Sequence, residues 1–252
     1  MKIDCIADLH GHYPKLEGGD LLIVAGDLTA RHTIKELDQF NEWVREQDYR
    51  KKILIAGNHD TFFEQGVFDV NNPVDGTVFV DPSVEYLCDS GTEITYYPHL
   101  DPPNFDNIGV AYKRKTLKIW GSPWSLTFPG INPRCTAFTG TEEELAEKWA
   151  LIPDDIDILV THGPPWGILD KLNRGFFTLS EPPVKVYEHV GSKSLAFKIG
   201  LMTTPPKLWV WAHIHEAYGE DRIVRQKPCK MVNASHVNER YEPVNNPIRV
   251  IL

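Results

Sequence analysis

Short apolar runs that do not alternate with polar residues are the most regular feature of this chain. The clearest of them cover residues 3–7, 21–25, 53–56, 158–161 and 208–212. Such a run is typical of a strand that is buried on both faces, as in a sheet covered by helices. Two further runs, at 231–233 and 248–252, are expected to complete the sheets.

Apolar residues at helical spacing lie between these runs. They predict helices over 33–47, 141–151 and 192–201. Thr33 and Thr141 stand as N-caps, and Glu36 and Glu144 follow three residues later, which is the capping-box pattern. Strands that alternate with helices predict an α/β fold.

The periodicity fades between residues 62 and 107, where Asn, Pro, Asp and Gly accumulate. Because so long a structureless stretch is uncommon in a compact domain, a short hidden element is expected there, at 77–80. The proline-rich stretches predict loops above the sheet at 98–103, 123–133 and 164–183. The runs 110–112 and 117–120 predict a hairpin around Lys113, Arg114 and Lys115.

Polar segments with metal-binding side chains lie at the ends of five of the strand-like runs. They are Asp8-Leu9-His10, Gly26-Asp27, Gly57-Asn58-His59-Asp60, Thr161-His162-Gly163 and His213-Ile214-His215. An α/β sheet brings the ends of distant strands to one rim, so these segments are expected to meet. Together they offer two Asp, one Asn and four His, with His59 beside them, which is enough to hold two divalent ions.

The spacing within the segments suits such a site. Asp8 and His10 can reach one ion if the backbone bends, and Gly11 permits a bend. The two carboxylate oxygens of Asp27 can bridge ions roughly 3.5–4 Å apart. His213 and His215 need a bend or bulge to face inward together. Mixed oxygen and imidazole ligands suit Mn, Fe, Zn or Ni. Each segment alone has a plain structural interpretation as a turn or strand end, but five in one order favour function.

Composition narrows the class of protein. The chain has 252 residues, 42% of them hydrophobic and 24% charged, which is the balance of a globular protein and allows one domain over 1–252. No run of 18 apolar residues is present, so no membrane span is expected. A cleaved leader would remove Asp8 and His10, so the protein is expected to be cytoplasmic. The net charge of -9 argues against binding duplex nucleic acid.

The order of the five segments resembles the calcineurin-like metallophosphoesterase family. The match runs from Asp8 to His215. Further segments are similar to the metallophosphoesterase-domain-containing branch, which is related to class III cyclic-nucleotide phosphodiesterases. They are Trp120-Gly121-Ser122-Pro123-Trp124, Thr161-His162-Gly163-Pro164-Pro165, Gly191-Ser192-Lys193-Ser194-Leu195 and His213-Ile214-His215-Glu216. The resemblance implies a four-layer α/β/β/α sandwich with two metal ions above its sheets.

The resemblance also implies a role for each ligand. Asp8, His10 and His215 would hold the first ion, and Asn58, His162 and His213 the second, with Asp27 bridging them. The ions are expected to be divalent transition metals, with Mn favoured and Fe, Zn, Ni or Co as alternatives. One departure is visible: the family has Gly before His-x-His, whereas this chain has Ala212, which disfavours a positive φ.

The implied reaction is hydrolysis of nucleotide or cyclic-nucleotide phosphodiesters, with a metal-bridging hydroxide as nucleophile. His59 would contact the phosphate and protonate the leaving group. Asp60 would either orient His59 or cap the turn. His12 is a candidate phosphate contact or a surface histidine, and the amide of Asn58 is a second neighbour of the phosphate.

Substrate preference stays open at this point. The patch Lys113, Arg114 and Lys115 would meet a second phosphate or form a solvated hairpin tip. Several rim aromatics would stack a base or pack in the core: Trp124, Phe128, Trp166, Phe176 and Phe177. Two other functions compete, a nuclease for short single-stranded RNA or DNA and a non-catalytic metal-binding scaffold. No membrane partner is expected, and the sequence does not indicate an oligomeric state.

Overall fold

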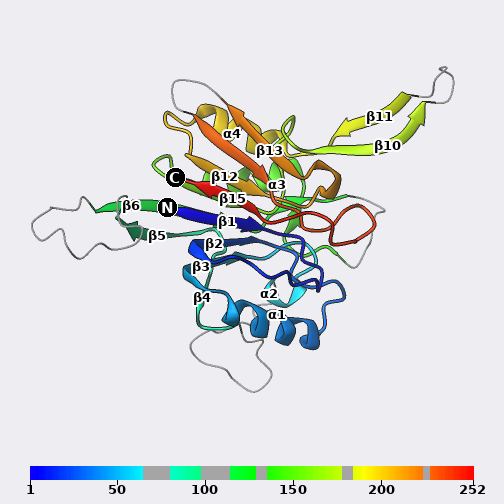
Figure 1. The fold of residues 1–252 in the computed structure, drawn as a ribbon. Helices are drawn as coiled ribbons and strands as arrows, with labels where there is room; N and C mark the ends of the chain where they lie inside the picture. The colour runs from blue at the N-terminus through cyan, green and yellow to red at the C-terminus, as the bar shows by residue number, and fades with distance from the viewer. Residues whose placement is uncertain (65–79, 98–113, 129–134, 178–183, 224–227) are drawn as a thin grey trace, which may run out of the picture.

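Two stacked sheets form the centre of the computed structural model, which describes residues 1–64, 80–97, 114–128, 135–177, 184–223 and 228–252 (Figure 1). The first sheet has the order β15-β1-β2-β3-β4. Its strands are Ile248–Ile251, Lys2–Ile6, Gly19–Ala25, Tyr49–Ile55 and Val84–Tyr86. The second sheet has the order β13-β14-β12-β9-β6-β5. Its strands are Gly219–Ile223, Cys229–Asn233, Leu208–Trp211, Ile158–Thr161, Lys115–Ser122 and Ser90–Tyr96.

The continuous apolar runs arise because each central strand is covered on both sides. In β2, Ile23 lies in the core between the two sheets, whereas Leu22 and Val24 pack toward α1. In β12, Val210 faces the same core between the sheets, and Trp209 packs on the outer side. Successive side chains of a strand point to opposite faces, so a strand buried on both faces needs apolar residues throughout.

Helices cover the two outer faces. They are α1 (Ile34–Glu46), α2 (Thr61–Glu64), α3 (Glu142–Ala150) and α4 (Lys193–Leu201), whereas the 3₁₀ turn η1 (His215–Ala217) lies at the rim. Phe40 of α1 packs on the first sheet, and Trp149 of α3 and Leu195 of α4 pack on the second. The expected α/β/β/α layers are therefore confirmed, as are the capping boxes of α1 and α3.

Of three further sequence predictions, one lies outside the described residues, one is confirmed in kind and one differs from the structure. β6 pairs with β5 and β9, and the predicted hairpin partner at 110–112 lies outside the described residues together with 77–79 and Lys113. The short hidden element expected within 62–107 is present as β4 and β5, and the sequence hides β5 because only its Ile94 and Tyr96 are buried. The predicted loop at 164–183 includes β10 (Lys171–Phe177), which pairs with β11 (Val184–His189) in a hairpin that projects from the body (Figure 1).

A small parallel pair, β7 (Ser125–Leu126) and β8 (Thr139–Gly140), lies beside the ends of the main strands. At these ends the two sheets are joined directly. The N–H of Ala7 in the first sheet donates to Ala234 beyond β14 of the second, at 2.9 Å. The polar segments that follow the strands are thereby brought to one rim. Within the described residues, no helix is long and apolar enough to cross a membrane.

Candidate metal centre

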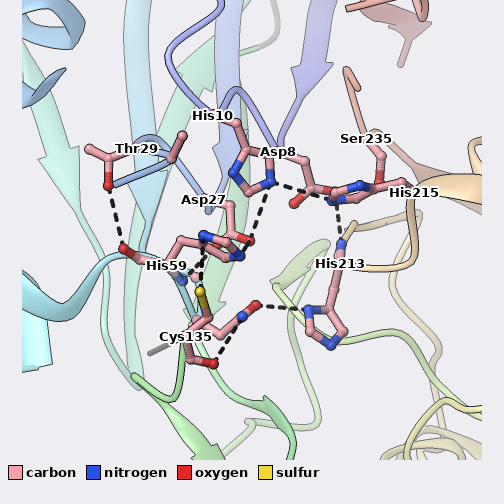
Figure 2. A network of polar contacts seen from close by, with 12 residues as sticks. Asp8, His10, Asp27, Thr29, His59, Cys135, His213, His215 and Ser235 are labelled. Carbon is pink, nitrogen blue, oxygen red and sulfur yellow. Dashed lines mark hydrogen bonds and ion pairs between the residues drawn. The ribbon is translucent and has the colours of Figure 1, made fainter. Parts of the chain in front are cut away.

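The polar segments at the ends of the strands converge at this rim (Figure 2). Asp8, His10 and His215 each offer a ligand atom within 4.8 Å of the other two, and we call them the first cluster. The amide oxygen of Asn58 lies 3.0 Å from Nε2 of His162 and 2.8 Å from Nδ1 of His213. These three residues are the second cluster. The structure thus brings six of the seven predicted ligands together in two groups.

Asp27, the seventh, lies between the clusters. Its Oδ2 is 3.7 Å from Nε2 of His10 in the first cluster and 3.5 Å from Nε2 of His162 in the second. Its Oδ1 accepts the backbone N–H of His59 at 2.8 Å. A single oxygen therefore faces both clusters, whereas the sequence suggested a bridge through both oxygens.

The backbone at the rim is locally strained. Asp8, His10, Asp27 and His213 all have a positive φ, of 48°, 44°, 54° and 70°. Non-glycine residues adopt this region at a cost of about 1–3 kcal/mol each, and such residues gather at functional sites. The turn at His213 lets it and His215 face inward together. Ala212 does not have a positive φ, so the departure from glycine at this position strains nothing.

Close packing explains one of the glycines in the segments. A Cβ on Gly57 would lie 2.6 Å from Cε1 of His162 and would also overlap the Asp27 side chain. Any larger residue would push the ligands of the second cluster apart.

Hydrogen bonds on the side away from the centre orient the ligand side chains of the second cluster. Nδ1 of His162 donates to the carbonyl of Ala25 at 2.9 Å, so its Nε2 faces the centre. The amide nitrogen of Asn58 donates to the carbonyl of Cys135 at 3.2 Å, so its oxygen faces the two histidines. In the first cluster, Nδ1 of His215 donates to Asn238 at 3.1 Å. Partners of this kind fix which ring nitrogen a metal ligand presents.

The charge states of His10, His213 and Asp27 suit cation binding, whereas His162 must first lose a proton. Burial lowers the pKa of His10 well below its ordinary value and that of His213 to about 3, so both rings are neutral. Burial opposes ionisation of Asp27, but His162 and His59 hold the pKa of Asp27 well below its usual range. Burial also favours a neutral His162, yet the carboxylate of Asp27 raises the pKa of His162 to about 9.

The donor set fits two divalent ions. Nδ1 of His162 is committed to Ala25, so once Nε2 has given up its proton, its lone pair faces an electron pair of the Asn58 oxygen. A cation between them removes this conflict. Oδ1 of Asp8 is buried without a hydrogen-bond partner, and burial raises the pKa of this carboxyl group, which also suits an ion in the first cluster. Nitrogen and oxygen ligands of this kind suit Mn, Fe, Zn, Co and Ni.

The other predicted site residues lie close by. Nε2 of His59 is 4.0 Å from Oδ2 of Asp27, and its Nδ1 is 3.3 Å from Sγ of Cys135. Asp60 is buried and accepts the backbone N–H groups of Gly57 at 2.9 Å and Leu28 at 3.1 Å. It therefore joins the segments that carry Asp27 and Asn58. Burial raises the pKa of Asp60 to about 7.

A cavity of about 300 Å³ opens beside the two clusters. Phe128 lines it and stacks on His213, with ring centroids 5.5 Å apart. A separate groove along the first cluster is lined by the exposed His12 together with His10 and His59. Tyr241 lines both the cavity and the groove, and its ring lies 4.8 Å from that of His10.

Sequence patterns did not single out Tyr241 or Cys135. Neither follows a strand. The only available signal was an aromatic residue within the polar stretch 238–242.

Two of the aromatic residues predicted to lie at the rim are not part of the cavity lining. Trp124 is partly buried between the outer cores and donates to Asp89. Trp166 lies beside His189, away from the cavity lining. The side chains of Phe176 and Phe177 lie outside the described residues.

Two residues of the predicted basic patch are far from the rim. Arg114 and Lys115 stand at the start of β6, whereas β6 reaches the rim at Ser122, which pairs with Thr161. Seven residues of strand separate the two ends, or roughly 23 Å. Contact of Lys115 with a phosphate at the metal centre is therefore excluded.

Known proteins resemble this chain in sequence and in fold. A profile of the calcineurin-like phosphoesterase family matches residues 1–217. The chain is 33% identical over 268 residues to metallophosphoesterase domain-containing protein 1 of Homo sapiens, which covers 98% of this chain and 70% of that protein. The protein of the same name from Mus musculus matches equally well. The crystal structure of TT1561 of Thermus thermophilus superposes with a TM-score of 0.52 at 14% identity, over 93% of this chain and 90% of that one, and this likeness shows the fold.

Proposed function

Because the chain belongs to the calcineurin-like phosphoesterase family, we propose that it is a two-metal phosphodiesterase that acts on nucleotide or cyclic-nucleotide diesters. The observation that carries the proposal is the position of Oδ2 of Asp27, less than 4 Å from a histidine of each cluster. Family members typically bind two divalent ions, and these clusters are compatible with them. Mn²⁺ is the proposed ion in both.

The first cluster, Asp8, His10 and His215, would hold one ion, and Asn58, His162 and His213 would hold the other, with Asp27 shared. When bound, two such ions supply a water acidic enough to act as nucleophile near neutral pH and offset the charge of the phosphoryl oxygens. All remaining tasks fall to side chains of this protein.

His59 is the proposed proton donor to the leaving group. Its Nε2 is the imidazole nitrogen that faces the centre without belonging to either cluster. Its main-chain N–H is held by Asp27 at 2.8 Å, and its carbonyl accepts the hydroxyl of Thr29 at 3.4 Å. The ring is thus placed by the same carboxylate that lies between the clusters. Asp60 is a positioning residue in this proposal, since its contacts are with the backbone of Gly57, Leu28 and Thr29.

The cavity supports a diester rather than a polyphosphate. Among the described residues that line it, none is Lys or Arg, while Glu216 and Glu239 add negative charge. Apolar surface comes from Leu126, Phe128 and Ile214. The phosphate of a diester carries one negative charge, which the bound ions would offset. An uncharged aromatic substituent would suit the apolar side of the cavity. The groove on the other side of Tyr241, lined by His12, would take the second substituent.

The proposed location is the cytoplasm. Cys5, Cys88 and Cys229 are free thiols in the structure, which supports a reducing compartment.

The test is turnover of the Mn²⁺-loaded protein on a matched set of substrates. The set contains a chromogenic diester, its monoester, 2′,3′- and 3′,5′-cyclic nucleotides, a 5′-mononucleotide, a nucleoside triphosphate and a short single-stranded oligonucleotide. Diesters are expected to react fastest. Preference for the oligonucleotide would favour a nuclease, and no turnover with any divalent ion would favour a scaffold.

His59→Gln separates catalysis from metal binding. It removes the proton donor, so kcat for a poor leaving group should fall roughly 10²- to 10⁴-fold with both ions retained. A diester with an acidic phenol as leaving group needs little protonation and should lose much less. Equal losses on both diesters, or unchanged turnover, would exclude the role of His59 as acid. His189→Gln, at a partly exposed histidine outside the linings of the cavity and the groove, is the control for replacement of a histidine.

A further inference from the structure

We propose that His32, His59 and Cys135 form a third cation site, separate from the two clusters, which takes Zn²⁺ or another soft divalent ion and withdraws His59 from the substrate. The three residues each offer one ligand atom, and these atoms lie within 4.8 Å of one another. Sγ of Cys135 is 3.3 Å from Nδ1 of His59 and 3.9 Å from Nε2 of His32.

These separations are close to what a zinc ion requires. With Zn–S and Zn–N bonds of about 2.3 and 2.0–2.1 Å in a tetrahedral arrangement, sulfur and nitrogen ligands stand roughly 3.5 Å apart. The rings of His32 and His59 are stacked, with centroids 5.8 Å apart and an angle of 8° between their planes. Because each nitrogen binds an ion in the plane of its own ring, one of the two rings must turn out of the stack when the ion binds.

The surroundings hold the ligands in place. Nδ1 of His32 is 3.2 Å from the hydroxyl of Thr61, which leaves Nε2 to face Cys135. His32 has a positive φ of 57°, a conformation that histidine seldom adopts and that aims its side chain inward. The carbonyl of Cys135 is tied to the amide of Asn58 at 3.2 Å, so the loop that carries the thiol is fixed to the second cluster.

The ligand types favour a soft ion over the ions proposed for the two clusters. Neither cluster contains sulfur, whereas the third site combines one thiol with two imidazoles. Thiolates select Zn²⁺ and similar ions, and Mn²⁺ prefers oxygen. On binding, the S–H bond of Cys135 breaks, its proton passes to solvent and a bond from sulfur to the ion forms. Three protein ligands leave a fourth position open, which faces the cavity that Cys135 and His59 line.

His59 connects this site to the two clusters. Its Nδ1 points to Cys135, and its Nε2 points to Oδ2 of Asp27. With a cation on Nδ1, Nε2 still carries a proton, but giving it up would leave an imidazolate, so the ring is a far weaker acid toward a leaving group. This inhibitory effect rests on the proposed function of His59, while the binding of the ion does not.

Cobalt binding tests the site without any measurement of turnover. Co²⁺ bound to a thiolate gives a near-ultraviolet charge-transfer band, and neither cluster has a sulfur ligand to produce one. Titration of the metal-free protein should give this band only after two equivalents, with a total of three ions per chain.

Two variants should lose the band and bind two ions. They are Cys135→Ser, which keeps a hydrogen-bonding group beside His59, and His32→Asn, in which the asparagine tolerates a positive φ. Cys88→Ser, at an exposed cysteine, should retain both. No band in the unmodified protein, or an undiminished band in Cys135→Ser, would overturn the proposal.

Zinc inhibition tests the connection to His59. Zn²⁺ added to the Mn²⁺-loaded protein should inhibit it, and the inhibition constant should rise at least about tenfold in Cys135→Ser and His32→Asn. The inhibition of each variant is measured against its own turnover without zinc. Equal inhibition of all variants would assign the effect to exchange of Mn²⁺ in the clusters and overturn the inhibitory part. If the protein turns over no substrate, the proposed function fails and the cobalt band still decides whether the third site exists.

Discussion

The first and second clusters each consist of three candidate ligands, but they differ in charge and in how they are anchored. The first cluster has a carboxylate of its own, Asp8, whereas the second has the neutral amide of Asn58 at the corresponding place. Both share Asp27. An ion in the first cluster therefore meets more negative charge, which tunes affinity for a divalent cation over decades.

The ligands of the second cluster are anchored more firmly than those of the first. His162 of the second cluster is fully buried and bonds to Ala25 of the other sheet, so the sandwich itself holds it. His215 of the first cluster has a side chain that is 11% exposed, and it bonds to Asn238 in a loop. The first cluster thus relies on charge and the second on rigid placement. An ion with fewer anionic ligands also keeps more of its own charge to polarise a phosphoryl group.

The largest effect is expected from Asp27→Asn, because it removes the group on which both clusters depend. The amide offers one neutral oxygen where the carboxylate gave a charged one. Bound metal should fall from two ions to one or none at micromolar metal, and kcat/KM should fall by roughly 10³-fold or more. Metal analysis after gel filtration checks the first result. Asp38→Asn, an exposed carboxylate on α1, is the control, and two ions retained by Asp27→Asn would show that Asp27 is not shared.

A smaller loss is expected from Gly57→Ala, which tests the rigid placement of the second cluster. The added methyl would lie 2.6 Å from Cε1 of His162, so that ring and Asp27 must move. A displacement of about 1 Å costs roughly 10²-fold in rate. Gly200→Ala is the control, because a methyl there meets no atom within 4 Å. If Gly57→Ala keeps full turnover, the second cluster is more adaptable than its packing indicates.

The sequence carried most of what defines these clusters. All seven candidate ligands follow apolar runs, and the carboxyl ends of such strands meet by topology. The structure brings the seven together at the rim, although their roles stay proposals. The helices were equally visible, because capping boxes such as Thr33 with Glu36 are local.

Features that depend on tertiary packing were not visible in the sequence. Tyr241 and Cys135 reach the rim from loops whose positions are set by contacts such as the one between Asn58 and the carbonyl of Cys135. Strand β5 was hidden because its polar residues face outward at a sheet edge. The sequence left two roles open for Asp60, and only the structure shows that its bonds go to the backbone of Gly57 and Leu28.

Substitutions that change the charge of one cluster should alter its affinity for a metal ion by a smaller factor. Asp8→Asn makes the first cluster as neutral as the second and should weaken one of the two ions roughly 10- to 50-fold. Asn58→Asp should tighten the other ion by about tenfold while lowering kcat, since a more neutralised ion polarises the phosphate less. Chelator competition measures both constants. Unchanged affinities in the two variants would show that geometry, not charge, sets the order of binding.

The smallest expected effect is the release of a proton from His162. It makes the metal affinity of the second cluster, which contains this histidine, depend on pH. The pKa of His162 is raised to about 9 despite burial, so the metal-free protein holds a proton on this ring near neutral pH. Nε2 must lose that proton to bind an ion, because Nδ1 is committed to Ala25. The second ion should therefore bind more tightly as the pH rises to about 9, and no further gain should come from His162 above that value.

Calorimetry in buffers of different ionisation enthalpy counts the protons released per chain. The count near pH 7.5 should exceed the count near pH 10 by about one, and His162→Gln should abolish this difference. Asp8→Asn should preserve it, which distinguishes the second cluster from the carboxyl group whose pKa burial also raises. Equal release at both pH values would mean that the ring is neutral before the ion arrives. In that case the conflict between Nε2 of His162 and the oxygen of Asn58 already exists in the metal-free protein, and metal binding, not proton loss, relieves it.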